Sequence, residues 1–414
     1  MNGSEVSPLR AWAASGAMAL TGRPDGPPRA APGRPAARVA EALNRVGELT
    51  RVRTGTRPAL PGVEILGERA AIAGLTRRGP MSCGGAFRVL RTADGRVGLS
   101  LPRAEDLELI PALTECAAQE ADPWETVQRW ARRTTTSEAT QRIALLGLAG
   151  SAIPAPEVNS RAGVEITEFG PRRHGREHPI VIDLTALWAG PLCAHLLGLG
   201  GARVIKVESI SRPDGARFGP PAFFDLLHHG HAMVGLDFHD PRDIDRLRTL
   251  IANADLVLEA SRARALRQLG IDATACATAG TSWLSITARG RTSNTVGFGD
   301  DIAAAAGLVV PDADDLLPCG DALADPLTGA CAAEAATRAL TAETTQLIDI
   351  SMLHLTAETT TPTTEPHTVH RRDNTWLVES DTGTYPVATP TARPTPTPAK
   401  PLGADNPTYL SALP

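Results

Sequence analysis

Residues 178–209 read HPIVIDLTALWAGPLCAHLLGLGGARVIKVES and constrain the fold more than any other stretch of the chain. An apolar run at 179–184 meets a short Trp-Ala-Gly-Pro turn, a helical stretch follows, and a second apolar run ends in Lys-Val-Glu. Apolar runs that alternate with helical stretches are typical of parallel strands joined by crossover helices. The alternation continues, and we expect further strands at 232–238, 255–260, 282–288 and 346–353.

The part of the chain before this stretch has a different pattern of predicted helices and strands. Residues 36–49 have helical apolar spacing, and 84–102 read as two strands around an Ala-Asp-Gly-Arg turn. Helical stretches follow, one of them with Asp122 as its N-cap. We therefore predict an α/β protein, with a Rossmann-like parallel sheet in a large domain and a smaller α+β domain, joined by long linkers. The expected division is 1–55 (N-terminal segment with a helix), 56–160 (small domain), 175–360 (large domain) and 361–414 (Pro/Thr-rich strap), with 154–178 as a polar linker.

Composition excludes several classes of function. The net charge of the 414 residues is −5 and no basic block stands out, so we expect no nucleic-acid partner. No apolar run approaches the roughly 18 residues of a membrane span, and the N-terminus lacks a signal pattern. The six cysteines include no CxxC pair, which favours a reduced, cytoplasmic protein over a disulfide scaffold or zinc site.

The turn at 188–191 is a candidate ligand site. In open α/β sheets, ligands lie beyond the carboxyl ends of the strands, where a helix N-terminus offers free N–H groups. Gly190 would let another group approach the backbone, and Pro191 suits a first helical turn. On the turn alone, a Gly-Pro pair with a purely structural role is the favoured explanation. The Gly-Leu-Gly-Gly run at 198–201 follows a helix instead of a strand, so it is not a dinucleotide fingerprint.

Taken together, several stretches resemble the family III CoA-transferases, also called the CaiB–BaiF family. These are VIDLTALWAGPLCAHLLGLGGARVIKVES, GHAMVGLDFHDPRDIDRLRTLIANADLVLEA, GFGDDIAAAAGLV, ADPLTGACAAEAATRAL and TYPVATPTARPTPTPAKPLGADN. The first half is similar to the family in a different order. CGGAFRVLRTADGRVGLSLP resembles the start of the small domain, and SGAMALTGRPDGPP with its following helix echoes the catalytic region without its aspartate. The domain order is therefore rearranged or permuted.

The resemblance implies a chemistry and a set of site residues. CoA would move between carboxylic acids through a covalent intermediate on Asp325, which has a glycine four residues on, and Asp300 would assist. An aspartate with its ordinary pKa of about 3.9 is ionised at neutral pH and needs no general base. The alternative is that Asp325 is a plain N-cap and that Asp300 and its neighbour Asp301 are N-cap acids as well. The implied contacts to CoA are Trp188, Ala189, Gly190, Ser209, His231 and Ala260, and the implied glycine-rich loop includes Gly84 and Gly85.

The resemblance also implies the partners. Acyl-CoA and a carboxylic acid would be substrates, no cofactor would be permanently bound, and the chain would form a homodimer of the interlocked kind known in the family. Three places depart from the family pattern. Ser209 replaces an arginine, Gly230-His231-Ala232 stands where Asn-Lys-Arg is usual, and Glu259-Ala260-Ser261 stands where Glu-Asn-Phe is usual. Fewer cations would face the CoA phosphates, unless arginines at 212, 217, 262 and 264 compensate.

Two other functions remain open from the sequence. A 2-methylacyl-CoA racemase of this fold needs a histidine–aspartate pair, but Phe298 stands at the expected position and no histidine occurs between His239 and His354. A degenerate subunit without catalysis is the other alternative. The histidines at 228, 229 and 231 invite a metal assignment, but their pattern favours a surface or helix-end cluster, so no metal is expected.

Overall fold

The computed structural model describes residues 7–410 apart from 117–121, 174 and 262. Its centre is a seven-stranded sheet in the order β4-β12-β9-β8-β5-β6-β7. All neighbouring strands pair in parallel except β4, which runs antiparallel to β12. The predicted Rossmann-like parallel sheet is confirmed. The strands are β4 (Val164–Pro171), β5 (Ile180–Leu184), β6 (Arg203–Ser209), β7 (Ala232–Leu236), β8 (Leu256–Glu259), β9 (Ser282–Thr287) and β12 (Thr344–Ser351).

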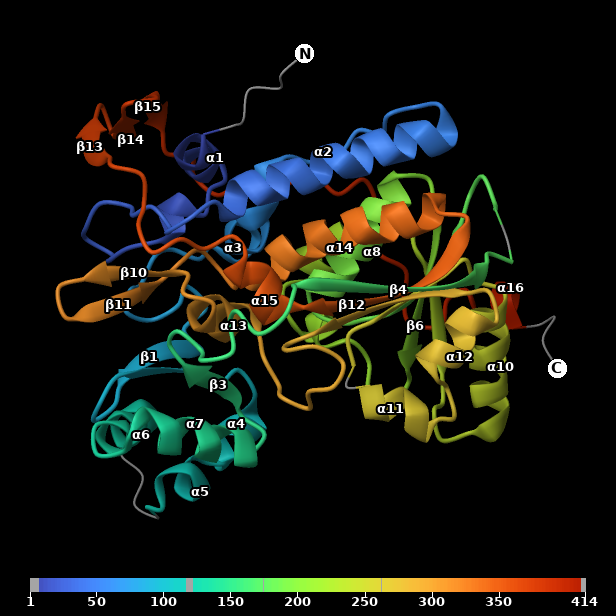
Figure 1. The fold of residues 1–414 in the computed structure, drawn as a ribbon, viewed down its shortest axis with the longest axis horizontal. Coiled ribbons are helices and arrows are strands. Elements are labelled where there is room, and N and C mark those ends of the chain that lie inside the picture. Colours follow the sequence, from blue (N-terminus) through green and yellow to red (C-terminus); the bar gives the residue numbers. More distant parts are fainter. Residues whose placement is uncertain (1–6, 117–121, 174, 262, 411–414) are drawn as a thin grey trace.

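Helices cover both faces of this sheet (Figure 1). Consecutive strand residues point to opposite faces, so Val181 joins the core under α8 and α14 while Ile182 joins the core under α10. This double burial explains why the strands read as continuous apolar runs. One face carries α2 (Pro35–Thr54), α8 (Ala189–Leu199), α9 (Pro221–His228), α14 (Ala324–Thr341) and α15 (Met352–Ala357); the other carries α10 (Pro241–Ala252), α11 (Ala263–Gln268) and α12 (Ala273–Thr278).

A smaller body lies beside the sheet, at the lower left of Figure 1. It contains a three-stranded antiparallel sheet of β1 (Phe87–Arg91), β2 (Arg96–Ser100) and β3 (Ala149–Ala152). The predicted hairpin at 84–102 is therefore present. Asp122 caps α6 as expected, because its carboxylate accepts from the Trp124 N–H at 3.0 Å. The helices of this body are α4 (Ala104–Glu108), α5 (Ile110–Thr114), α6 (Pro123–Ala131) and α7 (Thr136–Leu145).

Two expectations for the connecting segments were wrong. The stretch at 154–178 is not only a linker, since it contains β4, with Ile166 paired to Ile348. Most side chains of β4 are exposed, so this edge strand lacks the apolar signal of its neighbours. The tail after Thr360 is not a plain strap either: it first forms a three-stranded sheet and only then crosses the surface. That sheet contains β13 (Thr368–Arg372), β14 (Thr375–Ser380) and β15 (Gly383–Pro386), and the chain ends in α16 (Asn406–Leu410).

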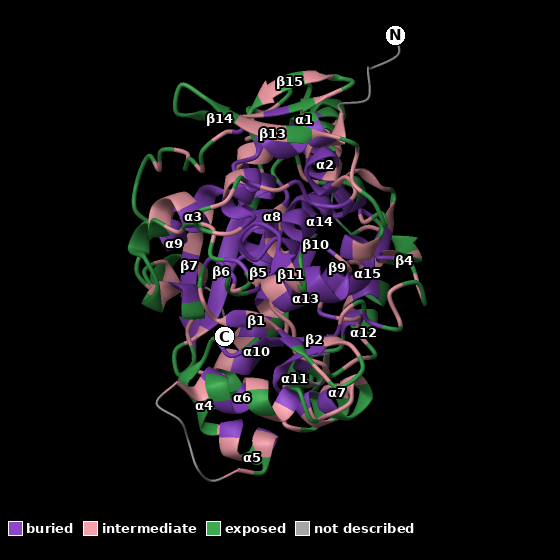
Figure 2. Cartoon of the chain, turned by 90° about the vertical axis from the view of Figure 1, so that its left-hand side faces the viewer, coloured by how far each residue is buried: buried purple, intermediate pink, exposed green. Residues whose placement is uncertain are grey.

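The N-terminal segment packs onto the large body. It contributes α1 (Pro8–Ala14) and α2, and α2 is joined to α14 by ion pairs of 2.9 Å from Arg38 and Arg45 to Glu334. Between the two bodies lie α13 (Gly299–Ala305) and the hairpin of β10 (Val309–Asp312) and β11 (Asp315–Pro318), while α3 (Glu68–Ala73) packs beside α9. Figure 2 shows the helices around α8 and α14 as a largely buried centre. Among the described residues, no helix has the length and apolar character to cross a membrane.

Candidate active site

Asp325 lies in the first turn of α14, but it does not cap that helix. The N-cap position is Leu323, and in the described part of the chain no group donates a hydrogen bond to the Asp325 carboxylate. The residue is half-buried. The start of α13 lies directly against it, because a Cβ atom added at Gly299 would lie 2.7 Å from Asp325 Oδ2. The alternative in which Asp325 is a plain N-cap is therefore wrong, and none of the described residues forms a hydrogen bond with its carboxylate.

Three further carboxylates surround Asp325, and each has a structural partner. Asp300 Oδ1 accepts the N–H of Ala322 at 2.9 Å, which ties α13 to the loop before α14. Asp301 Oδ1 accepts the N–H of Phe298 and the hydroxyl of Ser100, both at 2.9 Å, and so caps α13. Asp321, fully buried, forms an ion pair with Arg69. Asp301 thus fits the helix-capping alternative, while Asp300 holds the loop that presents Asp325.

Burial changes the ionisation of this cluster. It raises the pKa of Asp325 to about 7; Arg69 opposes the rise, and the negative charges of Asp300, Asp301 and Asp321 add to it. For Asp300, burial and the charge of Asp321 raise the pKa to about 6, again against Arg69. The expectation of a carboxylate with an ordinary pKa was therefore wrong. The cause lies in neighbours that come from separate parts of the sequence.

The Trp-Ala-Gly-Pro turn lies next to Asp325. Helices α8 and α14 pack so closely that a Cβ atom at Gly329, one helical turn after Asp325, would lie 2.7 Å from the Ala189 carbonyl oxygen. Ala189 begins α8 and Trp188 is its N-cap. The structure thus brings together the two sequence features that carried the functional hypothesis.

This close contact has a testable consequence. We expect Gly329→Ala to lower the free energy of unfolding by about 1–3 kcal/mol, because the added methyl group meets a backbone oxygen that cannot rotate away. Gly175→Ala is the matched control, since a Cβ atom there meets nothing within 4 Å. Chemical denaturation of both variants measures the difference; equal stabilities would show that the helix pair can separate freely.

Gly190 has a packing role. A Cβ atom at this position would lie 2.2 Å from the Cβ atom of Thr185, so the side chain of Thr185 fills the space that the glycine leaves. The group that approaches the Gly190 backbone is thus part of this chain. Trp188, only 4% exposed, packs its ring edge-to-face against Phe223 at 5.4 Å between centroids.

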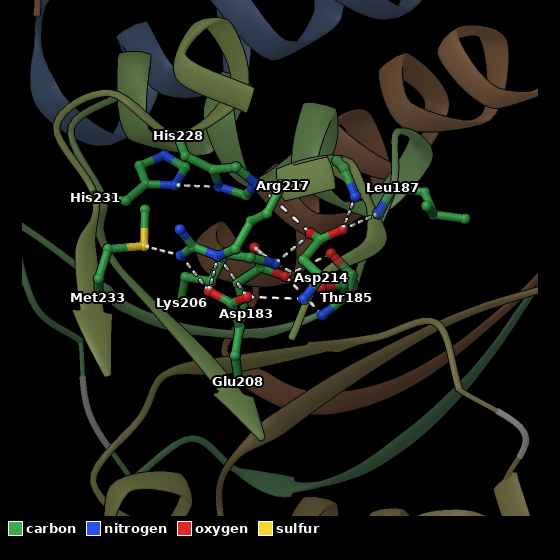
Figure 3. A network of polar contacts seen from close by, with 11 residues as sticks. Asp183, Thr185, Leu187, Lys206, Glu208, Asp214, Arg217, His228, His231 and Met233 are labelled. Carbon is green, nitrogen blue, oxygen red and sulfur yellow. Dashed lines mark hydrogen bonds and ion pairs between the residues drawn. The ribbon is translucent and has the colours of Figure 1, made fainter. Parts of the chain in front are cut away.

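A buried polar network contacts the residues just before the Trp-Ala-Gly-Pro turn (Figure 3). Leu187 has a left-handed backbone (φ 69°), and its N–H donates to Asp214 Oδ1 at 2.9 Å. Asp214 Oδ2 pairs with Lys206 Nζ at 3.0 Å, and Lys206 also donates to the Thr185 carbonyl at 2.6 Å. Lys206 is fully buried. Its ammonium therefore links the end of β5 to the loop that fixes Leu187 and Trp188.

The remaining predicted CoA contacts do not all lie together. Ser209 ends β6 and Ala260 follows β8, so both are at the carboxyl edge of the sheet with Trp188. His231 precedes β7, whose first residue Ala232 pairs with Ile205, so it lies at the opposite edge. It is 4% exposed, and an added Cβ on Gly198 would lie 3.4 Å from its Nε2. In the structure, His231 therefore does not lie beside the Trp-Ala-Gly-Pro turn.

The compensating arginines are only partly described. The Arg217 guanidinium pairs with Glu208 at 2.6 Å and lies 4.1 Å from the Phe224 ring centroid, so its charge is already matched. Arg212 is exposed. Arg262 and the Arg264 side chain lie outside the described residues.

The histidine cluster differs from its prediction. His228 ends α9, as a helix-end cluster requires, but it is fully buried and its Nδ1 lies 3.4 Å from that of His231. The surface location was wrong. Burial lowers the pKa of His231 to about 3, so its ring is neutral. Among the described residues, no group of three or more histidine, cysteine or acidic side chains is arranged to hold a metal ion.

The glycine-rich loop reaches the same site from the small body. Gly85 has a left-handed backbone (φ 82°), and its N–H donates to the Ser82 carbonyl at 2.9 Å, forming a tight turn. Gly84 is exposed beside the guanidinium of Arg69, since an added Cβ atom would lie 3.9 Å from Arg69 Nη2. The loop therefore lies over Arg69, on the side where that arginine pairs with Asp321.

Sequence reasoning missed Arg69, Asp321 and Asp214. Arg69 stands in an ordinary amphipathic stretch, and Asp321 comes from a loop without a motif. Lys206 did carry a signal that could have led to Asp214: it is one of two lysines in the chain and interrupts an apolar strand. A charge in a buried strand requires a buried partner.

The fold is a mostly parallel α/β sheet, and the Asp325 carboxylate at the start of α14 accepts no hydrogen bond from the described residues. The profile of CoA-transferase family III matches residues 178–389, just over half of the chain. The chain belongs to this family.

Individual relatives match over shorter stretches. The chain is 32% identical over 101 residues to (R)-2-hydroxy-4-methylpentanoate CoA-transferase of Clostridioides difficile, covering 22% of this chain and 25% of the relative. It is 35% identical over 92 residues to succinyl-CoA:mesaconate CoA-transferase of Haloarcula hispanica, covering 19% and 22%. A solved CAIB/BAIF family protein from Brucella suis covers 49% of this chain and 65% of its own, with 22% identity and a TM-score of 0.43. The chain thus spans about a quarter of the length of these curated relatives.

Proposed function

We propose that this protein transfers CoA between carboxylic acids, with Asp325 as the nucleophile. The observation that carries the proposal is the Asp325 carboxylate, which accepts no hydrogen bond from the described residues and lies one helical turn from the contact with the Ala189 turn. A carboxylate without a structural task, beside a helix start at the ligand edge of a sheet, suits covalent catalysis.

In the proposed reaction, an Asp325 oxygen attacks the thioester carbonyl of an acyl-CoA. The carbon–sulfur bond breaks, CoA leaves as its thiolate, and a mixed anhydride remains on the aspartate. The thiolate then attacks the aspartyl carbonyl, which releases the donor acid and leaves a CoA thioester on Asp325. The acceptor carboxylate repeats the two steps in reverse. Each step forms one acyl bond and breaks another, so no further reactant is required.

The chain's own residues would prepare these steps. Asp300 fixes the loop before α14 through Ala322, and Asp214 with Lys206 fixes the turn at Leu187. With a pKa of about 7, Asp325 becomes the attacking anion as the pH rises through neutrality. Its desolvation also makes that anion a stronger nucleophile than a hydrated carboxylate. Trp188, Ser209 and Ala260 remain proposed CoA contacts, and the homodimer remains a prediction.

Mass spectrometry after incubation with a panel of acyl-CoAs tests the proposal. We expect a CoA-sized or hydroxylamine-labile adduct on Asp325, whose rate of formation rises between about pH 6 and pH 8 because the ionised form attacks. Asp325→Asn should form none, while Asp272→Asn, a remote N-cap, should behave as the unmodified protein does.

The other functions give different outcomes in the same experiment. Solvent deuterium at the 2-position of the acyl group, without an adduct, would indicate a racemase in which Asp325 and Asp300 exchange protons. Binding of CoA without adduct or exchange would indicate a degenerate subunit. Either result would reject covalent transfer.

A further inference from the structure

Arg69 contacts two parts of the candidate site, the loop that carries Asp321 and Trp188 at the start of α8. It comes from α3, which lies outside the stretch matched by the family profile. One side of its guanidinium pairs with the fully buried Asp321, and its central carbon lies 5.3 Å from the centroid of the Trp188 ring. An ion pair and a ring face together fix the orientation of a planar guanidinium.

The charges around Arg69 come from several elements. From α13, Asp300 and Asp301 face Asp325; from the loop before α14 comes Asp321; and from the glycine-rich loop Cys83 lies near Arg69, Asp300 and Asp321. Burial alone would lower the pKa of Arg69, but Asp321, Asp300 and Asp325 together raise it, so Arg69 stays charged. Three of these carboxyl groups, Asp300, Asp321 and Asp325, therefore share Arg69, while Asp301 lies near Arg289.

We propose that Arg69 is the positioning cation of this site: it holds Asp321 beside Asp325 and favours the charged, attacking form of Asp325 over the protonated one. This inference deepens the proposed function and rests on it for the role of Asp325. A carboxylate beside three like charges and little water would otherwise retain its proton. The Nε atom of Arg69 is buried and has no hydrogen-bond partner, so one donor of the guanidinium is unused.

A direct titration of Asp325 tests the inference without any turnover. Carbon-13 NMR of carboxyl-labelled aspartate follows the ionisation, and Asp325→Asn identifies the signal by its loss. Arg69→Gln should move the midpoint upward by roughly one to three pH units, because one opposite charge disappears. Arg69→Lys should move it less. Arg57→Gln is the matched control, since Arg57 pairs with Glu48 on an exposed surface.

A second variant should shift the titration midpoint of Asp325 in the opposite direction. Asp321→Asn removes a negative neighbour and leaves the full charge of Arg69 to Asp300 and Asp325, so the midpoint should move downward. This variant, with Arg69→Lys, carries the test if Arg69→Gln does not fold. The pH profile of adduct formation should shift in parallel, with about a tenfold loss of rate for Arg69→Gln at pH 7 and recovery at higher pH.

The two proposals fail in different ways. An unchanged Asp325 midpoint in Arg69→Gln or an upward shift in Asp321→Asn would overturn the role of Arg69, even if adducts form normally. Shifted midpoints in a protein that forms no adduct would reject the transferase function and leave the electrostatic role of Arg69 intact.

Discussion

Asp325→Asn will reduce the rate of CoA transfer by on the order of 10³-fold or more, and it will stabilise the fold above neutral pH. The amide cannot attack a thioester, so the covalent path closes. The stabilisation follows from burial, which raises the pKa of Asp325 to about 7, against its ordinary value of 3.8. The folded state then holds this proton more tightly than the unfolded state, so the aspartate protein loses stability as the pH rises from about 4 to 7.

The asparagine variant does not share this loss. Its advantage in the free energy of unfolding should be near zero at pH 4, grow through pH 7 and level off above it, at roughly 2 kcal/mol once partial exposure is allowed for. Urea denaturation at pH 4.5 and pH 8 measures the two ends. If the variant were inactive but its advantage in the free energy of unfolding were the same at both pH values, Asp325 would have to be well solvated.

Asp300→Asn is the matched control for this experiment. Its amide oxygen can still accept the Ala322 N–H, so the loop before α14 should keep its position. Loss of the negative charge at 300 lowers the pKa of Asp325, and adduct formation should therefore extend to lower pH. If Asp300→Asn instead abolished the adduct across the pH range, Asp300 would have a direct part in the chemistry.

The sequence predicted the sheet because its strands are buried on both faces. Apolar runs such as 179–184 admit few other structures when helices alternate with them. The same rule explains why the sequence did not predict β4. Ile166 and most of its neighbours are exposed, and the strand is held by pairing with β12. A strand defined by its partner leaves little trace in its own residues.

The site was predicted only where its parts are close in sequence. Trp188, Ala189 and Asp325 follow from local patterns and from the resemblance. Arg69 could not be found in this way, because its partner Asp321 lies about 250 residues away in the sequence and the pair forms only in the folded chain. The pKa of Asp325 depends on charges from α3, α13 and the loop before α14, so no single stretch encodes it.

The largest effect on stability is expected at Lys206, the buried centre of the network in Figure 3. Lys206→Met should lower the free energy of unfolding by about 3–5 kcal/mol, since methionine fills the space but leaves Asp214 charged and unpaired in a dry site. Burial alone would lower the pKa of Lys206, but Asp183 and Asp214 raise it on balance. Lys206 outweighs burial to lower the pKa of Asp214.

These directions set the pH range of the effect. A lysine with a raised pKa stabilises the fold at every pH below its ordinary value of 10.5, and an aspartate with a lowered pKa does so above 3.8. The loss in Lys206→Met should therefore be nearly constant between about pH 5 and pH 9. Denaturation across this range checks it, and a loss confined to one end would assign the effect to a different group.

The chain offers an unusually close control, because its only other lysine is Lys400. Lys400 pairs with Asp405 at 2.7 Å, but its side chain is 54% exposed, so Lys400→Met should change stability by less than about 1 kcal/mol. The double variant Lys206→Met with Asp214→Asn should recover part of the loss, because the uncompensated charge is gone while an oxygen remains to accept the Leu187 N–H. The rate of adduct formation in this double variant then separates two roles of the network, stabilising the fold and orienting the turn at Trp188. If stability recovers but adducts still form slowly, the ammonium of Lys206 itself orients the turn.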